Sequence, residues 1–196
     1  MIKQDTITIT FTLLAVMISL YLSTFELGVP IIFPTILLIS GIIFQFYLLR
    51  RVETVDGLSE PETLSGIVFY TLIALAVLAV SGIVVPRIVG ALPMELTGTD
   101  ALLYSILMAV AEEQFFRGTL TNFLLQLTSP TPAILGSAAV FCVYHLAVYK
   151  TDVSALMYVF AGGLTLAWVG YRSGRLSPSV CAHVLNNILA FTVMVR

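Results

Sequence analysis

The sequence has very little charge. Asp, Glu, Lys and Arg together make up 10% of the 196 residues, against roughly 25% in ordinary soluble domains. Hydrophobic residues reach 59%, so a globule of this length could not cover its surface with polar side chains. This shortage excludes a soluble enzyme and a disordered chain, and it places the protein in a lipid bilayer. The net charge of −2 supplies no basic surface, so no nucleic-acid partner is expected.

Cysteine and strand-like alternation are also nearly missing. The two cysteines, Cys142 and Cys181, both lie in apolar runs, which predicts small buried hydrophobes rather than a disulfide. Inside hydrocarbon the backbone must satisfy its hydrogen bonds within a helix or a closed barrel. Because the apolar runs are long and show no period of two, they favour helices. We predict an all-α fold, a polytopic transmembrane helical bundle.

The apolar runs number about seven. A helix needs roughly 20 apolar residues to cross a bilayer. The predicted spans cover residues 6–25, 29–49, 64–85, 101–127, 132–149, 153–170 and 177–195. Residues 50–62 are the most polar stretch and are predicted to form an extramembrane loop. The first run could also be a cleaved signal peptide, but its length favours a retained span.

The placement of basic residues predicts the orientation in the membrane. Basic residues are enriched on the cytoplasmic side of membrane proteins. With seven spans, the side of the N-terminus carries five basic residues and the opposite side three: Lys3, Arg50, Arg51, Arg172 and Arg175 against Arg87, Lys150 and Arg196. We therefore expect an integral, multi-pass protein of the cell membrane with a cytoplasmic N-terminus.

Three charged residues lie inside a predicted span. Glu112, Glu113 and Arg117 fall near the middle of residues 101–127, where each charge costs at least about 2.5–3.5 kcal/mol. Glu113 and Arg117 are four residues apart, which predicts an ion pair on one helix face. Glu112 is turned roughly 100° away from its neighbour and has no cation nearby in the sequence. A carboxylate in that position is a candidate general base.

Both histidines of the chain also lie in predicted spans. The helical rise places Glu112 and His145 each roughly 20 Å from the turn near Pro130, so antiparallel neighbours would bring them to one level. His183 is only roughly 9 Å from the start of its own span. That span therefore begins deeper than its neighbours or tilts. Asn187 lies one turn beyond His183 on the same helix face.

These residues also have structural interpretations. A histidine in a span can bind a backbone carbonyl, and an asparagine or a Glu–Arg pair can join helices. Their convergence at one depth nevertheless favours a functional site. Cys142 lies three residues before His145 and would allow a Cys–His dyad, although a buried core cysteine is favoured. Several aromatic residues are predicted to pack and to form pocket walls: Phe115, Phe116, Phe141, Tyr144 and Trp168.

Three short motifs resemble those of a known family. Residues 112–117 read EEQFFR and resemble an EExxxR motif, residues 141–145 read FCVYH and resemble FxxxH, and His183 with Asn187 resembles HxxxN. In this order, each on a predicted span, they resemble the CPBP family of intramembrane proteases. That family includes the eukaryotic CAAX prenyl proteases of the Rce1 type and the bacterial Abi proteins. The resemblance implies catalytic core helices in residues 101–196.

The resemblance also implies what the site does. The protein would be an intramembrane endopeptidase in which Glu112 and His145 activate a water molecule. His183 and Asn187 would stabilise the oxyanion of the tetrahedral intermediate. The substrate would be a membrane-embedded or lipid-anchored peptide, which the sequence does not identify further. The resemblance does not extend to residues 1–100, whose apolar runs predict N-terminal transmembrane helices and the polar loop.

Two points of this interpretation stay open. Glu113 and Arg117 would support the site, and which of the two glutamates is the base is left undecided. No cofactor is expected, because the HExxH motif is absent and the residues serve equally well without metal. Zinc bound by Glu112, His145 and His183 is the less favoured alternative.

Two other classes of function remain as alternatives. The polar residues could hold helices or a ligand in a non-catalytic membrane binding or scaffold protein, such as an immunity-type relative. Glutamate and histidine in spans can also relay protons in a transporter. The sequence has no internal repeat that would support the common transporter architectures.

Overall fold

The computed structural model describes residues 2, 17, 18, 21, 32–49, 63–89 and 99–194. Apart from three isolated residues, the predicted span at 6–25 lies outside this set, as does the predicted loop at 50–62. Four of the eight basic residues used to predict orientation are outside it as well, so the orientation stays a prediction. The elements found in the described residues are all helical, as predicted.

The helices follow the predicted apolar runs. They are α2 (Ile32–Leu49), α3 (Leu64–Val89), α4 (Thr99–Glu112), α6 (Pro130–Tyr149), α7 (Val153–Ser173) and α8 (Ser177–Met194). Between α4 and α6 lie a π-helical segment, η1 (Glu113–Thr121), and the short helix α5 (Asn122–Leu127). The predicted span at 101–127 is thus one helical run whose middle is π-helical.

Local sequence explains where several helices begin and end. Helix α6 starts at Pro130, because proline suits the first helical turn, where its missing N–H would have no partner. Helix α7 is capped by Asp152, whose carboxylate accepts a hydrogen bond from the N–H of Ala155 (3.0 Å). The same helix stops after Ser173 because Gly174 takes the left-handed conformation, with φ at 65°, that commonly ends helices.

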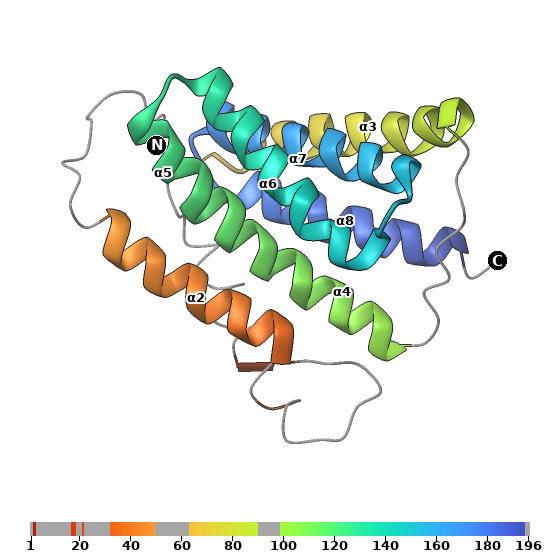
Figure 1. Cartoon of the computed structure of the whole chain (residues 1–196), viewed down its shortest axis with the longest axis horizontal. Coiled ribbons are helices and arrows are strands. Elements are labelled where there is room, and N and C mark those ends of the chain that lie inside the picture. The colour runs from red at the N-terminus through yellow and green to blue at the C-terminus, as the bar shows by residue number, and fades with distance from the viewer. Residues whose placement is uncertain are drawn as a thin grey trace.

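The run α4–η1–α5 passes through the middle of the bundle (Figure 1). Helix α2 packs on one side of it, against α4 and η1. Helices α8 and α6 contact the run on its other side, and α7 packs against both α6 and α8. Helix α3 contacts α7 and α8 at the far edge. The charged residues of η1 are therefore enclosed by helices on several sides.

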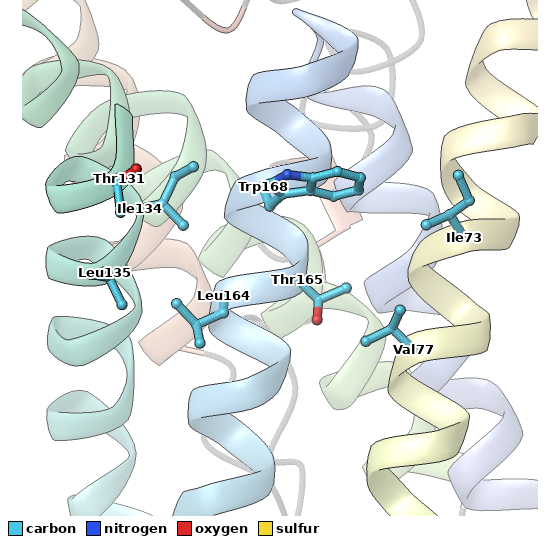
Figure 2. A pocket seen from close by; sticks show the side chains of 8 residues that line it. All are labelled: Ile73, Val77, Thr131, Ile134, Leu135, Leu164, Thr165 and Trp168. Atoms are coloured by element: carbon cyan, nitrogen blue, oxygen red, sulfur yellow. The ribbon is translucent and has the colours of Figure 1, made fainter. Parts of the chain in front are cut away.

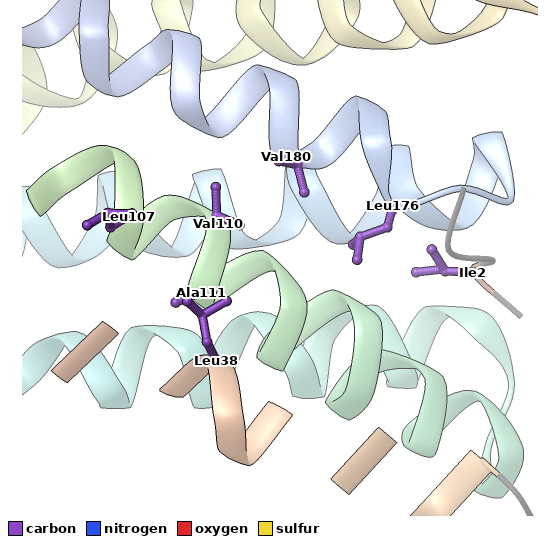
Figure 3. Close-up of a cluster of buried hydrophobic side chains, with 7 residues drawn as sticks. All are labelled: Ile2, Leu38, Leu107, Val110, Ala111, Leu176 and Val180. Carbon is purple, nitrogen blue, oxygen red and sulfur yellow. The ribbon is translucent and has the colours of Figure 1, made fainter. Parts of the chain in front are cut away.

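The apolar core lies where α2, α4 and α8 meet. Figure 3 shows one cluster of buried side chains there, which consists of Ile2, Leu38, Leu107, Val110, Ala111, Leu176 and Val180. Large hydrophobic side chains are also exposed on the outside of the bundle: Leu64 is 71% exposed and Val143 is 63% exposed. A bundle that is apolar inside and outside suits a lipid environment.

Three helices are long and apolar enough to cross a membrane: Leu64–Val85, Pro130–Tyr149 and Val153–Ser173. A shorter apolar stretch covers Ile32–Gln45. The predicted number of about seven spans is therefore not confirmed by the described residues. The run at 99–127, which is divided into α4, η1 and α5, is not among these helices.

Candidate active site

The two adjacent carboxylates lie at the point where the helix changes type. Glu112 is the last residue of α4, and Glu113 is the first residue of η1. Hydrogen bonds in a π-helix join residues five apart, and such segments are rare and frequently lie at functional sites. The hydroxyl of Thr121 donates to the carbonyl of Phe116, five residues earlier (2.8 Å), so a side chain helps to satisfy the widened turn.

Glu113 belongs to a fully buried ion pair. Its Oε1 lies 3.1 Å from Nη1 of Arg117, and both side chains are 0% exposed. Arg117 also donates from Nη2 to the carbonyl of Gly163 on α7 (3.2 Å), and its guanidinium lies 4.4 Å from the ring centroid of Phe141. A Cβ on Gly163 would lie 3.2 Å from Cα of Ala138, so α6 and α7 approach closely beside this anchor.

His183 is oriented by Glu113. Its Nδ1 lies 2.8 Å from Oε1 of Glu113. Because Glu113 is paired with Arg117 and its carboxylate only accepts hydrogen bonds, the hydrogen-bond partners assign the proton to Nδ1 of His183. Its Nε2 then faces the other carboxylate, 3.7 Å from Oε2 of Glu112.

His145 approaches Glu112 from α6. Its Nδ1 donates to the carbonyl of Phe141 (2.9 Å), since a carbonyl oxygen can only accept. Its Nε2 is therefore the acceptor nitrogen of the neutral ring, and it lies 3.8 Å from Oε1 of Glu112. The imidazole stacks on Tyr149, with ring planes 10° apart and centroids separated by 5.9 Å. The ring of His145 is thus fixed on two sides.

Glu112 lies between two imidazole rings without a direct hydrogen bond to either, since 3.7 and 3.8 Å exceed the normal range. The side chain of Glu112 is 7% exposed, that of His145 13% and that of His183 12%. The group is therefore largely buried but not sealed. A water molecule that donates to the carboxylate and to an imidazole nitrogen can bridge such separations.

Asn187 has a different environment from the other candidates. Its Nδ2 donates to the carbonyl of Ser105 (3.1 Å), and Ser105 lies seven residues before Glu112, or roughly 10 Å along the helix. The neighbouring Asn186 accepts from the hydroxyl of Tyr158 (3.0 Å). The described contacts therefore bring neither amide to the carboxylates.

Helix α8 begins inside the bundle. Residues 176–180 are all buried, and the hydroxyl of Ser179 donates to the carbonyl of Leu166 on α7 (2.8 Å). His183, six residues after Ser177, consequently reaches the level of Glu112. Burial against other helices does not measure depth in the membrane, so both explanations for the mismatch in depth stay predictions.

The structure brings five of the six predicted site residues together: Glu112, Glu113, Arg117, His145 and His183. Their catalytic and supporting roles remain predictions. Phe141, which was predicted to pack and to form a pocket wall, accepts a hydrogen bond from His145 through its carbonyl and contacts Arg117 through its ring. One partner was missed by sequence reasoning. Gly163 acts through its backbone carbonyl, for which the sequence contains no side-chain signal.

Other predicted residues lie apart from the carboxylates. Cys142 is half-buried and unpaired with another cysteine, and its thiol contacts the carbonyl of Leu156 (3.5 Å), a partner that gives no support to a Cys–His dyad. Trp168 lines a groove on the outer side of α7. Among the described residues, no group of three or more His, Cys, Asp or Glu side chains forms an arrangement that could hold a metal ion.

Residues 94–189 match the family model described as type II CAAX prenyl endopeptidase Rce1-like. This segment belongs to the Rce1-like family. It contains Glu112, His145, His183 and Asn187, and so it includes all three motifs that carried the resemblance. No curated protein and no solved structure matches the chain. The match of this segment to a CAAX protease family, together with three helices of membrane-spanning length, supports an integral membrane protein.

Proposed function

We propose that this protein is an intramembrane endopeptidase that hydrolyses a peptide bond in a membrane-embedded or lipid-anchored substrate. One observation carries the proposal: the carboxylate of Glu112 faces the Nε2 atoms of His145 and His183 at 3.8 and 3.7 Å. Hydrolysis without a covalent intermediate needs a base, a water molecule and donors for the oxyanion. The carboxylate of Glu112 can act as the base, and a water molecule can bind between this carboxylate and an imidazole ring.

Glu112 and His145 are assigned to the water molecule. Both Nε2 of His145 and the ionised carboxylate are acceptors, so a water between them donates one hydrogen to each. Its oxygen then keeps a lone pair for the substrate carbonyl. As the oxygen–carbon bond forms, the water gives a proton to Glu112. Glu112 returns this proton to the leaving amine nitrogen when the carbon–nitrogen bond breaks.

His183 and Asn187 are assigned to the oxyanion. Because Nδ1 of His183 already donates to Glu113, its Nε2 can donate to an oxyanion only when the ring carries a second proton. Asn187 would have to release the carbonyl of Ser105 and rotate toward the substrate. The stabilisation of the oxyanion by His183 and Asn187 therefore depends on a rearrangement in the substrate complex. The activation of water by Glu112 and His145 does not.

The Glu113–Arg117 pair is assigned a positioning role. Arg117 fixes the carboxylate of Glu113, and that carboxylate fixes the ring of His183 (2.8 Å). Since both charges are fully buried and bound by protein groups, neither is placed to touch a substrate. The base is therefore assigned to Glu112 and not to its neighbour.

The proposal is tested by cleavage of membrane-anchored peptides. The full-length protein is reconstituted in liposomes with a panel of fluorogenic peptides that carry a farnesyl group, a palmitoyl group or a transmembrane helix. We expect Glu112→Ala and His145→Ala to lose at least about 100-fold in rate while their thermal unfolding and elution remain like the wild type. Asn186→Ala, which removes an amide outside the site, serves as the matched control.

Full activity in both site variants would contradict the proposed mechanism, and no cleavage of any peptide by the wild type would favour the non-catalytic alternative. The panel also tests the substrate class, because the peptide that is cleaved fastest shows which kind of anchor is preferred. Metal independence is part of the proposal. Extensive treatment with chelators should leave the rate unchanged, and a loss of activity that zinc alone restores would assign the metal to Glu112, His145 and His183.

A further inference from the structure

A groove of about 440 Å³ lies on the outer side of α7, between α3 and α6. Figure 2 shows α7 in the middle of the view, with side chains from all three helices around the groove. Most of them are apolar: Ile73, Val77, Ile134, Leu135, Leu164 and Trp168. Gly163, which binds Arg117 through its carbonyl, is turned about 100° from Leu164 along α7. Gly163 and Leu164 thus lie on different faces of α7, one beside Arg117 and the other in the groove.

The groove faces the hydrocarbon of the bilayer. Its walls are α3, α6 and α7, which are the three helices with candidate membrane spans in the described residues. Val77 is 42% exposed, Leu135 is 46% exposed and Trp168 is 41% exposed. In a membrane, side chains exposed on such helices meet lipid chains instead of water. The chemistry of the lining therefore fits an acyl chain.

One end of the groove lies near the start of α6 and the end of α7, where a basic residue follows the lining residues along α7. Thr131, in the first turn of α6, lines this end together with Trp168. Arg172 is exposed in the last turn of α7, four residues after Trp168 and on the same helix face. Tryptophan is favoured at the bilayer interface, and basic side chains there attract anionic lipid headgroups.

We propose that the groove binds one anionic phospholipid, with an acyl chain along Leu164 and Leu135 and the phosphate at Arg172. Lengths agree with this placement. Eight residues separate Leu164 from Arg172, which is roughly 12 Å of helix, and one leaflet of the hydrocarbon core is roughly 15 Å thick. The chain thus runs from the interface toward the middle of the bilayer.

The sequence provides its own probe for this site, because Trp168 is the only tryptophan. The full-length protein is reconstituted in phosphatidylcholine vesicles that contain a small fraction of lipid with brominated chains, which quench tryptophan fluorescence on contact. We expect brominated phosphatidylglycerol to reach half-maximal quenching at about one-fifth of the mole fraction that brominated phosphatidylcholine needs. Unlabelled phosphatidylglycerol should relieve the quenching.

Two variants test the headgroup contact. Arg172→Gln should abolish the preference for phosphatidylglycerol, whereas Lys150→Gln, which removes the same charge from the turn between α6 and α7, should keep it. Equal quenching of the wild type by both lipids would overturn the proposal. So would equal effects of the two substitutions, or relief of quenching by a lipid-anchored peptide and not by phosphatidylglycerol.

Discussion

Glu112 and Glu113 are neighbours in the chain but have opposite surroundings. Glu113 is 0% exposed, pairs with Arg117 at 3.1 Å and accepts a hydrogen bond from His183 at 2.8 Å. Glu112 retains some exposure and faces two imidazole nitrogens at distances too long for direct hydrogen bonds. One carboxylate is held by protein groups, and the other is left able to bind a small molecule.

The two glutamates have different surroundings because consecutive residues of a helix point in different directions. Side chains one residue apart point roughly 100° from each other, so the two carboxylates face different neighbours. A buried ion pair contributes little net stability but is costly to break from one side only. Breaking the pair on the Glu113 side should therefore affect folding, whereas changes on the Glu112 side should affect the reaction.

The largest expected effect on stability comes from Arg117. Arg117→Ala leaves the carboxylate of Glu113 buried without its cation, and we expect a loss of about 3–5 kcal/mol in the free energy of unfolding. Chemical unfolding in detergent micelles measures it. The double variant Glu113→Gln with Arg117→Met removes both charges and should be more stable than Arg117→Ala alone. If the single variant is as stable as the wild type, the ion pair has no structural role.

Substitution of Asn187 tests whether its amide takes part in the reaction. If this amide rotates to the oxyanion, Asn187→Ala should reduce the single-turnover rate by roughly 100- to 1,000-fold. Asn186→Ala removes the adjacent amide, which binds Tyr158, and should leave the rate nearly unchanged. Equal rates in both variants would remove Asn187 from the site and leave His183 as the predicted donor to the oxyanion.

Substitution of Gly163 should disturb the surroundings of the Glu113–Arg117 pair less than the loss of Arg117. Gly163→Ala places a methyl group 3.2 Å from Cα of Ala138, which forces α6 and α7 apart beside the carbonyl that binds Arg117. We expect a loss of about 1–3 kcal/mol in the free energy of unfolding, measured as for Arg117→Ala. Gly162→Ala is the matched control, since its methyl group would meet only the flexible side chain of Leu78 (3.3 Å). A larger loss in the control would contradict the close packing at Gly163.

Part of this arrangement is predictable from local spacing. The i, i+4 spacing of Glu113 and Arg117 predicts a contact, and the structure shows it. The helical rise predicts that Glu112 and His145 lie at the same depth in the bundle. In the structure Oε1 of Glu112 is 3.8 Å from Nε2 of His145. Composition alone predicts a helical membrane protein, because so few charges cannot cover a soluble fold.

The rest depends on tertiary structure. The start of α8 is buried because Ser179 binds a carbonyl of α7, and no local pattern reports this, so the depth of His183 could not be fixed. The direction of the Asn187 amide depends on a carbonyl of α4. The number of spans is not settled either, because the predicted span at 6–25 lies almost entirely outside the described residues.

Chemical rescue tests most directly whether Glu112 is the base. Glu112→Gly removes the carboxylate and leaves space for formate, which can replace it beside the water molecule. We expect this variant to be inactive on the anchored peptide and to regain hydrolysis in proportion to added formate. Glu113→Gly, treated in the same way, should regain none. Rescue of Glu113→Gly and not of Glu112→Gly would contradict the assignment and move the base to the paired carboxylate.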